Sequence, residues 1–198
     1  MKPAVGVLAL QGAFREHIKA INKSGAIAFE IRWPEQLDKA DGLIIPGGES
    51  TTIHKLLYRY DFKKKLDGFY QEGKPIFGTC AGMIMVARKV VDEVFGLNYI
   101  DIVVKRNAYG RQIESFEQYV DIDFNQPSAG KKFKAIFIRA PRILEAGPSV
   151  KVLAKNGDDI ILARKNNVLV SSFHPELGSD NRVHEYFVDM VKNSKGEA

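Results

Sequence analysis

The sequence predicts an α/β fold: a mostly parallel central sheet flanked by helices on both faces, with antiparallel additions in the second half. Three observations support this prediction. Strand-like and helical segments alternate from the N-terminus to about residue 90, as in parallel sheets with right-handed crossovers. The run from Gly42 to Ile45 is apolar without alternation, as expected for a strand covered on both faces. Beyond residue 100, short strand-like runs follow one another with turn residues between them.

The elements of the first half follow from hydrophobic periodicity and from the residues that end each run. The helical pattern from Phe14 to Lys23 ends before Gly25, a residue type common at helix C-termini. A second helical region covers 53–70 and is expected to break near Asp61, and a third helix is predicted over 81–91. The strands between these helices are predicted at 5–10, 26–31, 42–45 and 75–78.

The second half is predicted to contain hairpins followed by one closing helix at 182–192. Turn residues at 156–158 and 166–167 separate its apolar runs. The chain has 198 residues and shows neither an internal repeat nor a linker, so we expect one domain over 1–198. The strands are predicted at 101–105, 116–124, 134–138, 150–154, 160–163 and 168–173.

Composition and charge argue against a membrane protein and against a nucleic-acid binder. The longest apolar runs are strand-sized, well short of the roughly 20 residues that cross a bilayer. The formal charge is +5, but Lys63-Lys64-Lys65 lie on the solvated side of an amphipathic pattern, and Lys131-Lys132 follow a separate turn. A single cysteine cannot form an internal disulfide, and no signal-type segment precedes the first apolar run, so we expect a cytoplasmic protein.

The only cysteine, Cys80, lies in the pentapeptide GTCAG, after a predicted strand and before a predicted helix. The pattern G-x-C-x-G is analogous to the nucleophile elbow of hydrolases, in which small neighbours permit a strained turn that exposes the nucleophile. A helix N-terminus favours the reactive thiolate, and the N–H of Ala81 is well placed to stabilise an oxyanion. A small buried side chain is the alternative interpretation of so short a pattern.

The segment SSFHPEL offers Cys80 a partner for proton transfer. Pro175 disfavours helical geometry at His174 and is expected to hold the segment extended. Residues two apart in an extended chain point the same way, so Glu176 is expected to lie beside His174 and orient its imidazole. Solvent exposure is expected for the three histidines that fall on helical patterns, His17, His54 and His184.

The glycine-rich turn PGGES, at 46–50, follows a predicted parallel strand. Such a turn exposes backbone N–H groups at the edge where open α/β sheets bind ligands, and Gly48 is the predicted second oxyanion donor. It is not a phosphate loop, because the pattern G-x-x-x-x-G-K-[ST] is absent. No cluster has the spacing of metal ligands, so neither a metal nor a cofactor is expected.

Together, Cys80 in GTCAG, His174-Pro175-Glu176 and PGGES resemble the motifs of class I, triad-type glutamine amidotransferases, in which cysteine, histidine and glutamate hydrolyse the glutamine amide. The blocks GVLALQGAFREH, PGGESTT, RNAYGRQ and FIRAP are similar to those of the glutaminase subunits of pyridoxal 5′-phosphate synthases. This second resemblance covers nearly the whole chain. It implies a flavodoxin-like amidotransferase fold with L-glutamine as the substrate.

The resemblance also implies a role for individual residues. Cys80 would be the nucleophile, His174 the general base and acid, and Glu176 its orienting partner. Gly48 and Ala81 would form the oxyanion hole. From spacing alone, a surface salt bridge is the default for the two arginines of the set. The residues implied to contact the substrate are Gly48, Glu49, Ser50, Arg106, Ile138 and Arg139.

A glutaminase of this kind needs a partner. Ammonia in neutral water is mostly ammonium, which lacks the lone pair needed for attack, so the product must reach a nearby acceptor site. The chain has no nucleotide-binding fingerprint and no residues left for a second catalytic domain, so a separate synthase subunit is expected. The resemblance implies a (β/α)8 barrel in a hetero-oligomer that makes pyridoxal 5′-phosphate and activates the glutaminase on docking. The loop Gln11-Gly12 is predicted at the active-site edge, so we expect it to be one contact.

Three alternatives stay open. The chain could be an amidotransferase subunit that serves another acceptor, such as the one that makes imidazole glycerol phosphate. It could be a redox sensor or interaction module that uses Cys80 as a switch, although such a switch has no need of the proton shuttle in His174-Pro175-Glu176. A cysteine peptidase is the third alternative, and it would require an open groove for its substrate.

Overall fold

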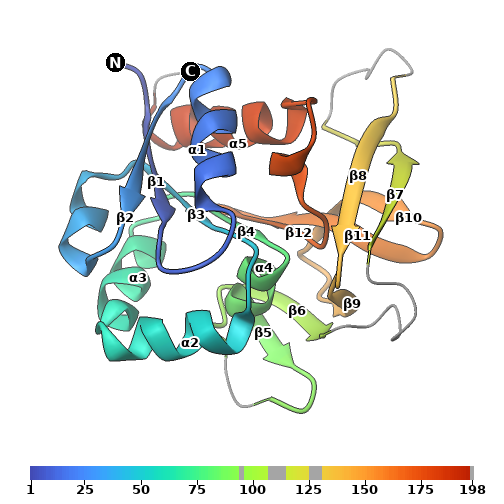
Figure 1. The fold of residues 1–198 in the computed structure, drawn as a ribbon, viewed down its shortest axis with the longest axis horizontal. Helices are drawn as coiled ribbons and strands as arrows, with labels where there is room; N and C mark the ends of the chain where they lie inside the picture. Colours follow the sequence, from blue (N-terminus) through green and yellow to red (C-terminus); the bar gives the residue numbers. More distant parts are fainter. Residues whose placement is uncertain (94–95, 107–114, 125–130, 197–198) are drawn as a thin grey trace.

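The computed structural model describes residues 1–93, 96–106, 115–124 and 131–196. Its central sheet has seven strands in the order β10-β11-β12-β4-β3-β1-β2 (Figure 1). Strands β12, β4, β3, β1 and β2 pair in parallel, and β11 and β10 add antiparallel at one edge. The strands are Ala4–Leu8 (β1), Ile27–Ile31 (β2), Gly42–Ile45 (β3), Ile76–Thr79 (β4), Lys151–Asn156 (β10), Asp159–Lys165 (β11) and Val168–Ser171 (β12).

The parallel part has the flavodoxin-like order, with β12 as its fifth strand. Helices α1 and α5 lie on one side of this sheet and α2, α3 and α4 on the other, so both faces are covered (Figure 1). The α-helices are Phe14–Lys23 (α1), Ser50–Arg59 (α2), Phe62–Gln71 (α3), Ala81–Val86 (α4) and Arg182–Ser194 (α5), and the 3-10 turns are Pro34–Lys39 (η1) and Pro175–Leu177 (η2).

Alternate side chains of β3 enter the two hydrophobic cores. Ile44 packs in one core with Ile21 of α1 and Phe187 of α5. Leu43 and Ile45 belong to the other core, together with buried side chains of α2 and α3. All four residues of β3 are buried, which is the pattern expected when helices cover both faces of a parallel strand.

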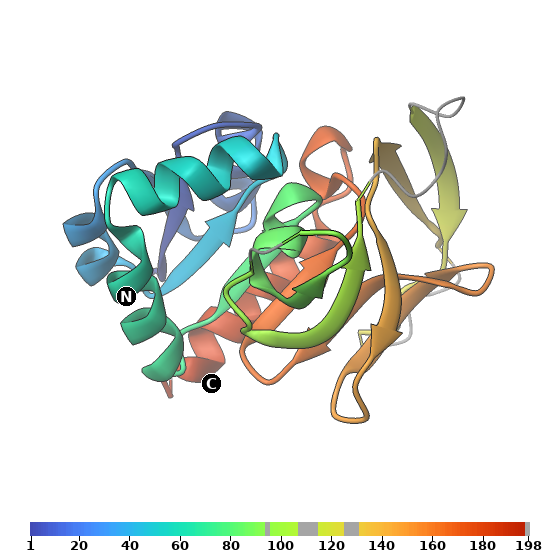
Figure 2. The same cartoon turned by 90° about the horizontal axis from the view of Figure 1, so that it is seen from below.

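Two smaller sheets extend the second half. One pairs Ala87–Val90 (β5) in parallel and Arg142–Ala146 (β9) antiparallel with Ile100–Lys105 (β6), and it lies below the central sheet, in front in Figure 2. The other is the antiparallel pair Ser115–Val120 (β7) and Phe133–Ile138 (β8). These pairs, with β10 and β11, confirm the predicted fold class, including its antiparallel additions.

The helix predicted over 81–91 is wrong in its second half. Helix α4 ends at Val86, and β5 begins at the next residue. In β5 the end residues are buried, while Arg88 and Lys89 face out, and Nε of Arg88 lies 2.6 Å from Oδ1 of Asp101 on the neighbouring strand. Strand pairing with a distant segment therefore overrides the local helical pattern, and that pairing is not visible in a short apolar run.

Other differences concern element ends. The break predicted near Asp61 is confirmed: this residue has φ 54° and separates α2 from α3. Strand β7 ends at Val120, four positions before the end of the predicted 116–124 strand, and helix α5 continues to Ser194 beyond the predicted 182–192. Strand β9 was not predicted, and in the structure the segment of Arg142 to Ala146 has exposed residues on either side of a single buried isoleucine.

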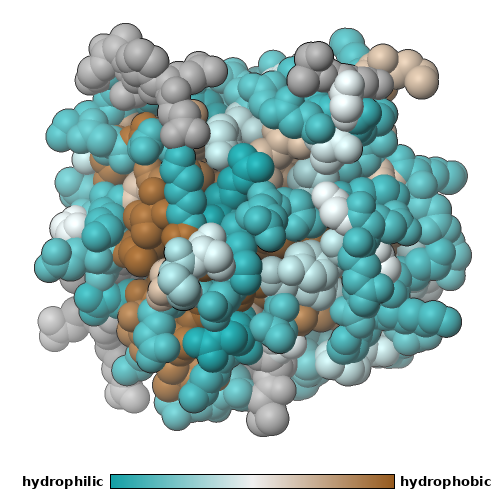
Figure 3. All heavy atoms as spheres, turned by 180° about the vertical axis from the view of Figure 1, so that it is seen from behind, coloured by the Kyte–Doolittle hydropathy of each residue, from teal (hydrophilic) through white to brown (hydrophobic). Residues whose placement is uncertain are grey.

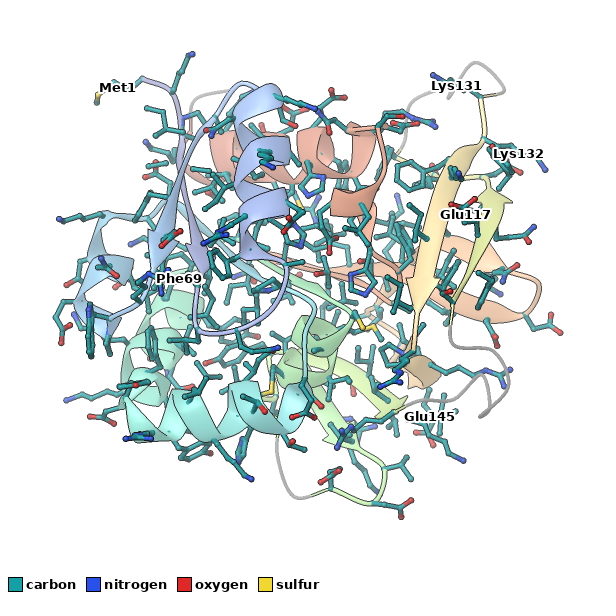
Figure 4. All side chains as sticks on the ribbon, in the orientation of Figure 1. Met1, Phe69, Glu117, Lys131, Lys132 and Glu145 are labelled. Carbon is teal, nitrogen blue, oxygen red and sulfur yellow. The ribbon has the colours of Figure 1, made fainter. Side chains whose placement is uncertain are left out.

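The surface is mostly hydrophilic with a hydrophobic strip when seen from behind (Figure 3). Lys131 and Lys132 lie at the outer end of β8, away from helix α3, where Phe69 is labelled (Figure 4). Helix α3 carries the other lysine group, Lys63-Lys64-Lys65, so the two basic groups are separate surface features as expected. Within the described residues, no helix is both long enough and apolar enough to span a membrane.

Candidate active site

Cys80 lies between the last residue of β4 and the first residue of α4, at the carboxyl edge of the sheet. Its backbone has φ 48° and ψ −103°, a strained conformation for a residue with a side chain. Two backbone hydrogen bonds hold the turn: the N–H of Cys80 donates to the carbonyl of Ser171 at 2.8 Å, and the N–H of Ile84 donates to the carbonyl of Cys80 at 3.2 Å. The local geometry is therefore that of the predicted nucleophile elbow.

Two glycines allow other backbone segments to approach the elbow. A Cβ atom on Gly82 would collide with the carbonyl of Ile45, so only glycine lets α4 begin against the end of β3. A Cβ atom on Gly47 would collide with the imidazole of His174 and come within 3.3 Å of the Cβ of Cys80. The glycine-rich turn after β3 thus packs directly on both side chains.

His174 lies beside Cys80 and Glu176. A Cβ atom on Gly47 would collide with Cε1 of His174 and lie 3.3 Å from the Cβ of Cys80, and Nδ1 of His174 lies 2.7 Å from Oε1 of Glu176. The backbone of His174 is not helical, as Pro175 predicts. The segment is not extended, however: η2 begins at Pro175, which suits the first position of a helical turn because it has no N–H to leave unpaired. The turn, rather than an extended chain, brings Glu176 beside His174.

The pair formed by His174 and Glu176 is ionised at neutral pH. Burial alone would lower the pKa of His174, but hydrogen bonds to Cys80 and Glu176 raise it to about 10. Burial would raise the pKa of Glu176, but the nearby His17 and His174 lower it to about 2. Burial also lowers the pKa of His17, which is then uncharged at neutral pH, so we assign the stabilisation of the Glu176 anion there to His174.

Cys80 and His174 lie in the wall of a cavity of about 570 Å³. Gln11 and Gly12 line the same cavity, as predicted for a loop at the active-site edge, and so does Ala81. The thiol of Cys80 lies 3.9 Å from the carbonyl oxygen of Ile138. All the residues that the resemblance assigns to substrate binding are in the wall: Gly48, Glu49, Ser50, Arg106, Ile138 and Arg139.

Arg106 and Glu49 form an ion pair in the wall of this cavity. Arg106 contacts Oε1 of Glu49 at 3.2 Å and Oε1 of Glu93 at 2.5 Å, so the salt bridge expected by default for Arg106 is present. Glu49 also caps helix α2 by accepting the N–H groups of Thr51 and Thr52. Its slight burial would raise its pKa, but the hydrogen bonds from the two threonines lower it to about 2. The cavity wall therefore presents one carboxylate and one guanidinium side by side.

The expected exposure of His17 and His184 is wrong, because both are fully buried; His54 is partly buried. The sequence did contain the signal. Each buried histidine shares the apolar stripe of its helix, at the spacing i, i+3, i+4, i+7. The other members of these stripes are Phe14, Ile18 and Ile21 on α1, and Phe187, Val188 and Val191 on α5.

The buried histidines belong to a polar network behind the site. Nδ1 of His17 lies 3.0 Å from Nε2 of His184, and Nε2 of His17 lies 3.1 Å from Oγ1 of Thr79. Thr79 Oγ1 also accepts the N–H of Gly47 at 3.0 Å. Nε2 of His17 is 3.4 Å from Oε2 of Glu176. Helix α1, the glycine-rich turn, the elbow and η2 therefore meet at one buried set of polar atoms that the motifs did not reveal.

A second hollow, of about 610 Å³, lies between η1 and α3. Its wall contains Trp33, Tyr60 and several charged side chains, but no histidine or cysteine among the described residues. The two hollows are of similar size, so volume does not decide between them. The cavity at Cys80 is the better candidate, because it alone of the two contains a nucleophile with an adjacent proton-transfer group.

The parallel sheet with a cysteine elbow and a histidine–glutamate pair at its carboxyl edge is the arrangement of a triad-type glutamine amidotransferase. The chain belongs to the SNO glutamine amidotransferase family, whose model matches residues 7–193. It is 52% identical to the pyridoxal 5′-phosphate synthase subunit PdxT of Pseudothermotoga lettingae, over 94% of this chain and 95% of that protein. It is 48% identical to the PdxT subunit of Bacillus cereus strain G9842, over 96% of each chain. The resemblance inferred from the motifs is confirmed.

Solved structures agree with this assignment. One described as a glutamine amidotransferase superposes with a TM-score of 0.88 at 45% identity, covering 94% of this chain and 98% of its own. A putative GMP synthase component from Thermoplasma acidophilum superposes with a TM-score of 0.74 at 14% identity, covering 99% of this chain and 97% of its own. At so low an identity the second likeness shows a shared fold.

Proposed function

We propose that this chain is the glutaminase subunit of a pyridoxal 5′-phosphate synthase. It hydrolyses L-glutamine to L-glutamate and ammonia and delivers the ammonia to a synthase subunit. The observation that carries the proposal is the position of His174 beside Cys80 in the wall of one cavity, with Glu176 in contact with its imidazole. Its family and its PdxT relatives support the same substrate and product. The chain acts as a single amidotransferase domain over residues 1–198, in the cytoplasm.

The first half of the reaction forms a thioester. The thiolate of Cys80, paired with the protonated His174, attacks the side-chain carbonyl carbon of glutamine, and the carbonyl oxygen becomes an oxyanion. As the first residue of α4, Ala81 has an N–H without an acceptor inside the helix, and Gly48 supplies the second donor. His174, which is protonated at neutral pH, gives its proton to the amide nitrogen, the C–N bond breaks and ammonia leaves.

The second half releases glutamate. His174 is now neutral and accepts a proton from water, whose oxygen attacks the thioester carbon. The C–S bond breaks, the thiolate of Cys80 is restored beside a protonated His174, and L-glutamate leaves. Glu176 keeps the imidazole oriented in both halves and stabilises its cationic form. No group besides the chain, the substrate and water is needed to balance these steps.

The ion pair of Glu49 and Arg106 binds the α-ammonium and α-carboxylate groups of the substrate. Free glutamine carries an ammonium and a carboxylate on the same carbon, and the Glu49–Arg106 pair in the cavity wall offers one charge of each sign. Arg106 binds the substrate carboxylate and Glu49 the ammonium, while Glu93 holds the other edge of the guanidinium. Ser50, Ile138 and Arg139 complete the wall around the substrate.

The partner is a synthase subunit with a (β/α)8 barrel, in a hetero-oligomer with this chain. The Gln11-Gly12 loop is one contact. Oε1 of Gln11 accepts the N–H of Glu49 at 2.8 Å, and the N–H of Ala13 donates to the carbonyl of Gly47 at 3.1 Å. A partner that binds to this loop can therefore change, through these hydrogen bonds, the position of the turn that contains the proposed oxyanion donor Gly48.

Reaction with a glutamine-like electrophile tests the proposal. With the synthase subunit present, we expect stoichiometric modification, with the adduct mapped to Cys80 by mass spectrometry and with loss of glutamate production. An adduct elsewhere, or full glutaminase activity of Cys80→Ala, would overturn the site. Mixing the chain with synthases that use other acceptors tests the pathway, because only the pyridoxal 5′-phosphate synthase subunit should raise the rate. Equal rates with and without that subunit would count against docking-dependent activation.

A further inference from the structure

The oxygen Oε2 of Glu176 lacks a hydrogen bond within the described part of the chain, although it is fully buried. Its partner oxygen, Oε1, contacts His174. An ionised carboxylate with one oxygen left unsupported in the interior is costly, so a nearby donor is expected. Nε2 of His17 lies within ion-pair distance of Oε2, at 3.4 Å, and its side chain is also fully buried.

The proton of His17 can be assigned from its surroundings. Nε2 faces two oxygen atoms, Oγ1 of Thr79 and Oε2 of Glu176. A lone pair on Nε2 would point at an anion, whereas an N–H there is attracted by both oxygens. With the proton on Nε2, Nδ1 of His17 accepts the Nε2–H of His184. Nδ1 of His184 is then a buried acceptor without a donor, which costs less than an unpaired N–H.

We propose that His17 is a positioning residue of the triad: its Nε2–H holds Oε2 of Glu176, and through Glu176 it fixes the imidazole of His174 against Cys80. His17 does not line the substrate cavity and touches no reacting atom, so it acts only through Glu176. Thr79 holds the same imidazole from the side of the elbow and accepts the N–H of Gly47. The inference rests on the proposed glutaminase and extends it by one buried residue.

The charged and titratable groups near this arrangement come from several elements. His17 faces Glu176 of η2, His184 of α5, and His174, and Glu16 lies on its own helix. His174 in turn faces Cys80 at the elbow and Glu176. Glu176 is the group that both histidines share. A Glu176 that is free to rotate would support the His174 cation less well, so loss of the His17 contact should lower the pKa of His174.

Two amide variants separate this role from packing. In His17→Gln the side-chain amide can reach the place of Nε2, whereas in His17→Asn it reaches only the place of Nδ1. Assayed with the synthase subunit present, His17→Asn should lower kcat roughly 10- to 100-fold with KM unchanged, as expected when a reacting side chain loses the group that orients it. His17→Gln should recover most of kcat. The alkaline limb of the kcat/KM profile should move to lower pH in His17→Asn only.

Several outcomes would overturn the proposal. Equal kcat in wild type, His17→Asn and His17→Gln would show that the contact has no effect. An equal loss in both variants with an unmoved alkaline limb would mean that His17 only fills space. In a Glu176→Gln background, a further loss on adding His17→Asn as large as in the wild type would mean that His17 does not act through Glu176.

A measurement on the unmodified chain covers the case in which His17→Asn fails to fold. Nitrogen-15 NMR of the imidazoles reports which ring nitrogen carries the proton. The proposal requires neutral His17 with its proton on Nε2, and a proton on Nδ1 would overturn it. This NMR measurement does not depend on turnover, so it tests the positioning role separately from the glutaminase activity. An inactive wild-type complex would instead contradict the glutaminase activity.

Discussion

The backbone N–H of Cys80 donates a 2.8 Å hydrogen bond to the carbonyl of Ser171, ninety-one positions later in the chain (171 − 80). Strands β4 and β12 are parallel neighbours, and Thr79 is the register partner of Ser171. The separation between the elbow and the segment that carries His174 is therefore set by sheet register rather than by a flexible loop. A site built in this way has its thiol and imidazole in place before the substrate arrives.

Removal of the thiol should abolish the reaction without unfolding the chain. We expect Cys80→Ala to lower glutamate production by roughly 10³-fold or more, because the sulfur is the atom that forms the thioester. Glutamate release is measured with the synthase subunit present, and circular dichroism checks the fold. Ser172→Ala is the matched control: its hydroxyl is buried without a hydrogen bond among the described residues, so activity should be retained. Substantial activity in Cys80→Ala would contradict the mechanism.

A methyl group on Gly47 should disable the site. In Gly47→Ala the new Cβ would collide with the imidazole of His174, so we expect kcat to fall roughly 100-fold, the effect of displacing a reacting group by about 1 Å. The control is Gly68→Ala, in helix α3, where nothing lies within 4 Å of the added atom. This control should leave kcat unchanged and raise the free energy of unfolding by about 0.5–1 kcal/mol. Normal turnover in Gly47→Ala would argue against the contact.

Loss of Arg106 should weaken substrate binding. We expect Arg106→Gln to raise KM for glutamine roughly 10- to 100-fold with a smaller change in kcat, because a charged hydrogen bond to the substrate carboxylate is lost. Steady-state kinetics over a wide range of glutamine concentrations measures this. Arg88 offers a matched control, since it also pairs with two acidic side chains but lies outside the cavity. A similar rise in KM for Arg88→Gln would show that the effect is not local.

Stability should fall as the pH is lowered from about 6.5 toward 3, because of the buried histidine His184. Burial, together with the neighbouring His17, lowers the pKa of His184 from 6.5 to about 3. Between these two pKa values the unfolded chain binds a proton that the folded chain does not bind. The free energy of unfolding therefore falls by up to about 1.4 kcal/mol for each pH unit because of this site. His17 acts in the same direction. His174 affects stability at alkaline pH. Its raised pKa gives a contribution to stability that is full below pH 6.5 and is lost as the pH rises through about 10.

Urea unfolding at pH 7.5, 6.5 and 5.5 measures this dependence. His184→Gln keeps a donor toward His17 but cannot take up a proton, so its free energy of unfolding should change less between pH 6.5 and 5.5 than that of the wild type. Gly68→Ala in helix α3 is the control, because it changes no titratable group, and its pH dependence should match the wild type. An unchanged slope in His184→Gln would contradict the assignment.

The sequence was sufficient for the parts of the site that depend on short-range rules. The elbow at Cys80 follows from its small neighbours, and the contact of His174 with Glu176 follows from their spacing, although a 3-10 turn rather than an extended chain makes it. The parallel sheet follows from apolar runs between amphipathic helices. The predicted roles of Gly48, Ala81 and the wall residues stay predictions, because position in a cavity does not measure chemistry.

Other parts depend on contacts between distant segments. Helix α4 ends at Val86 because the following residues pair with β6, and a local pattern does not contain that partner. The burial of His17 could have been predicted from the sequence, since its spacing places it on an apolar stripe. Its contacts with Thr79 and Glu176 could not, because the order of the strands in the sheet brings these distant segments together.

The solitary sulfhydryl makes quality control of a preparation simple. Because the chain contains one cysteine, at the elbow, a thiol-directed dye can label no other side chain of this type. The dye-to-protein ratio then counts molecules whose elbow is reachable and reduced, and dividing turnover by that count corrects for any inactive fraction. Labelling of other cysteines, which is usually avoided by substituting them, does not arise in this chain.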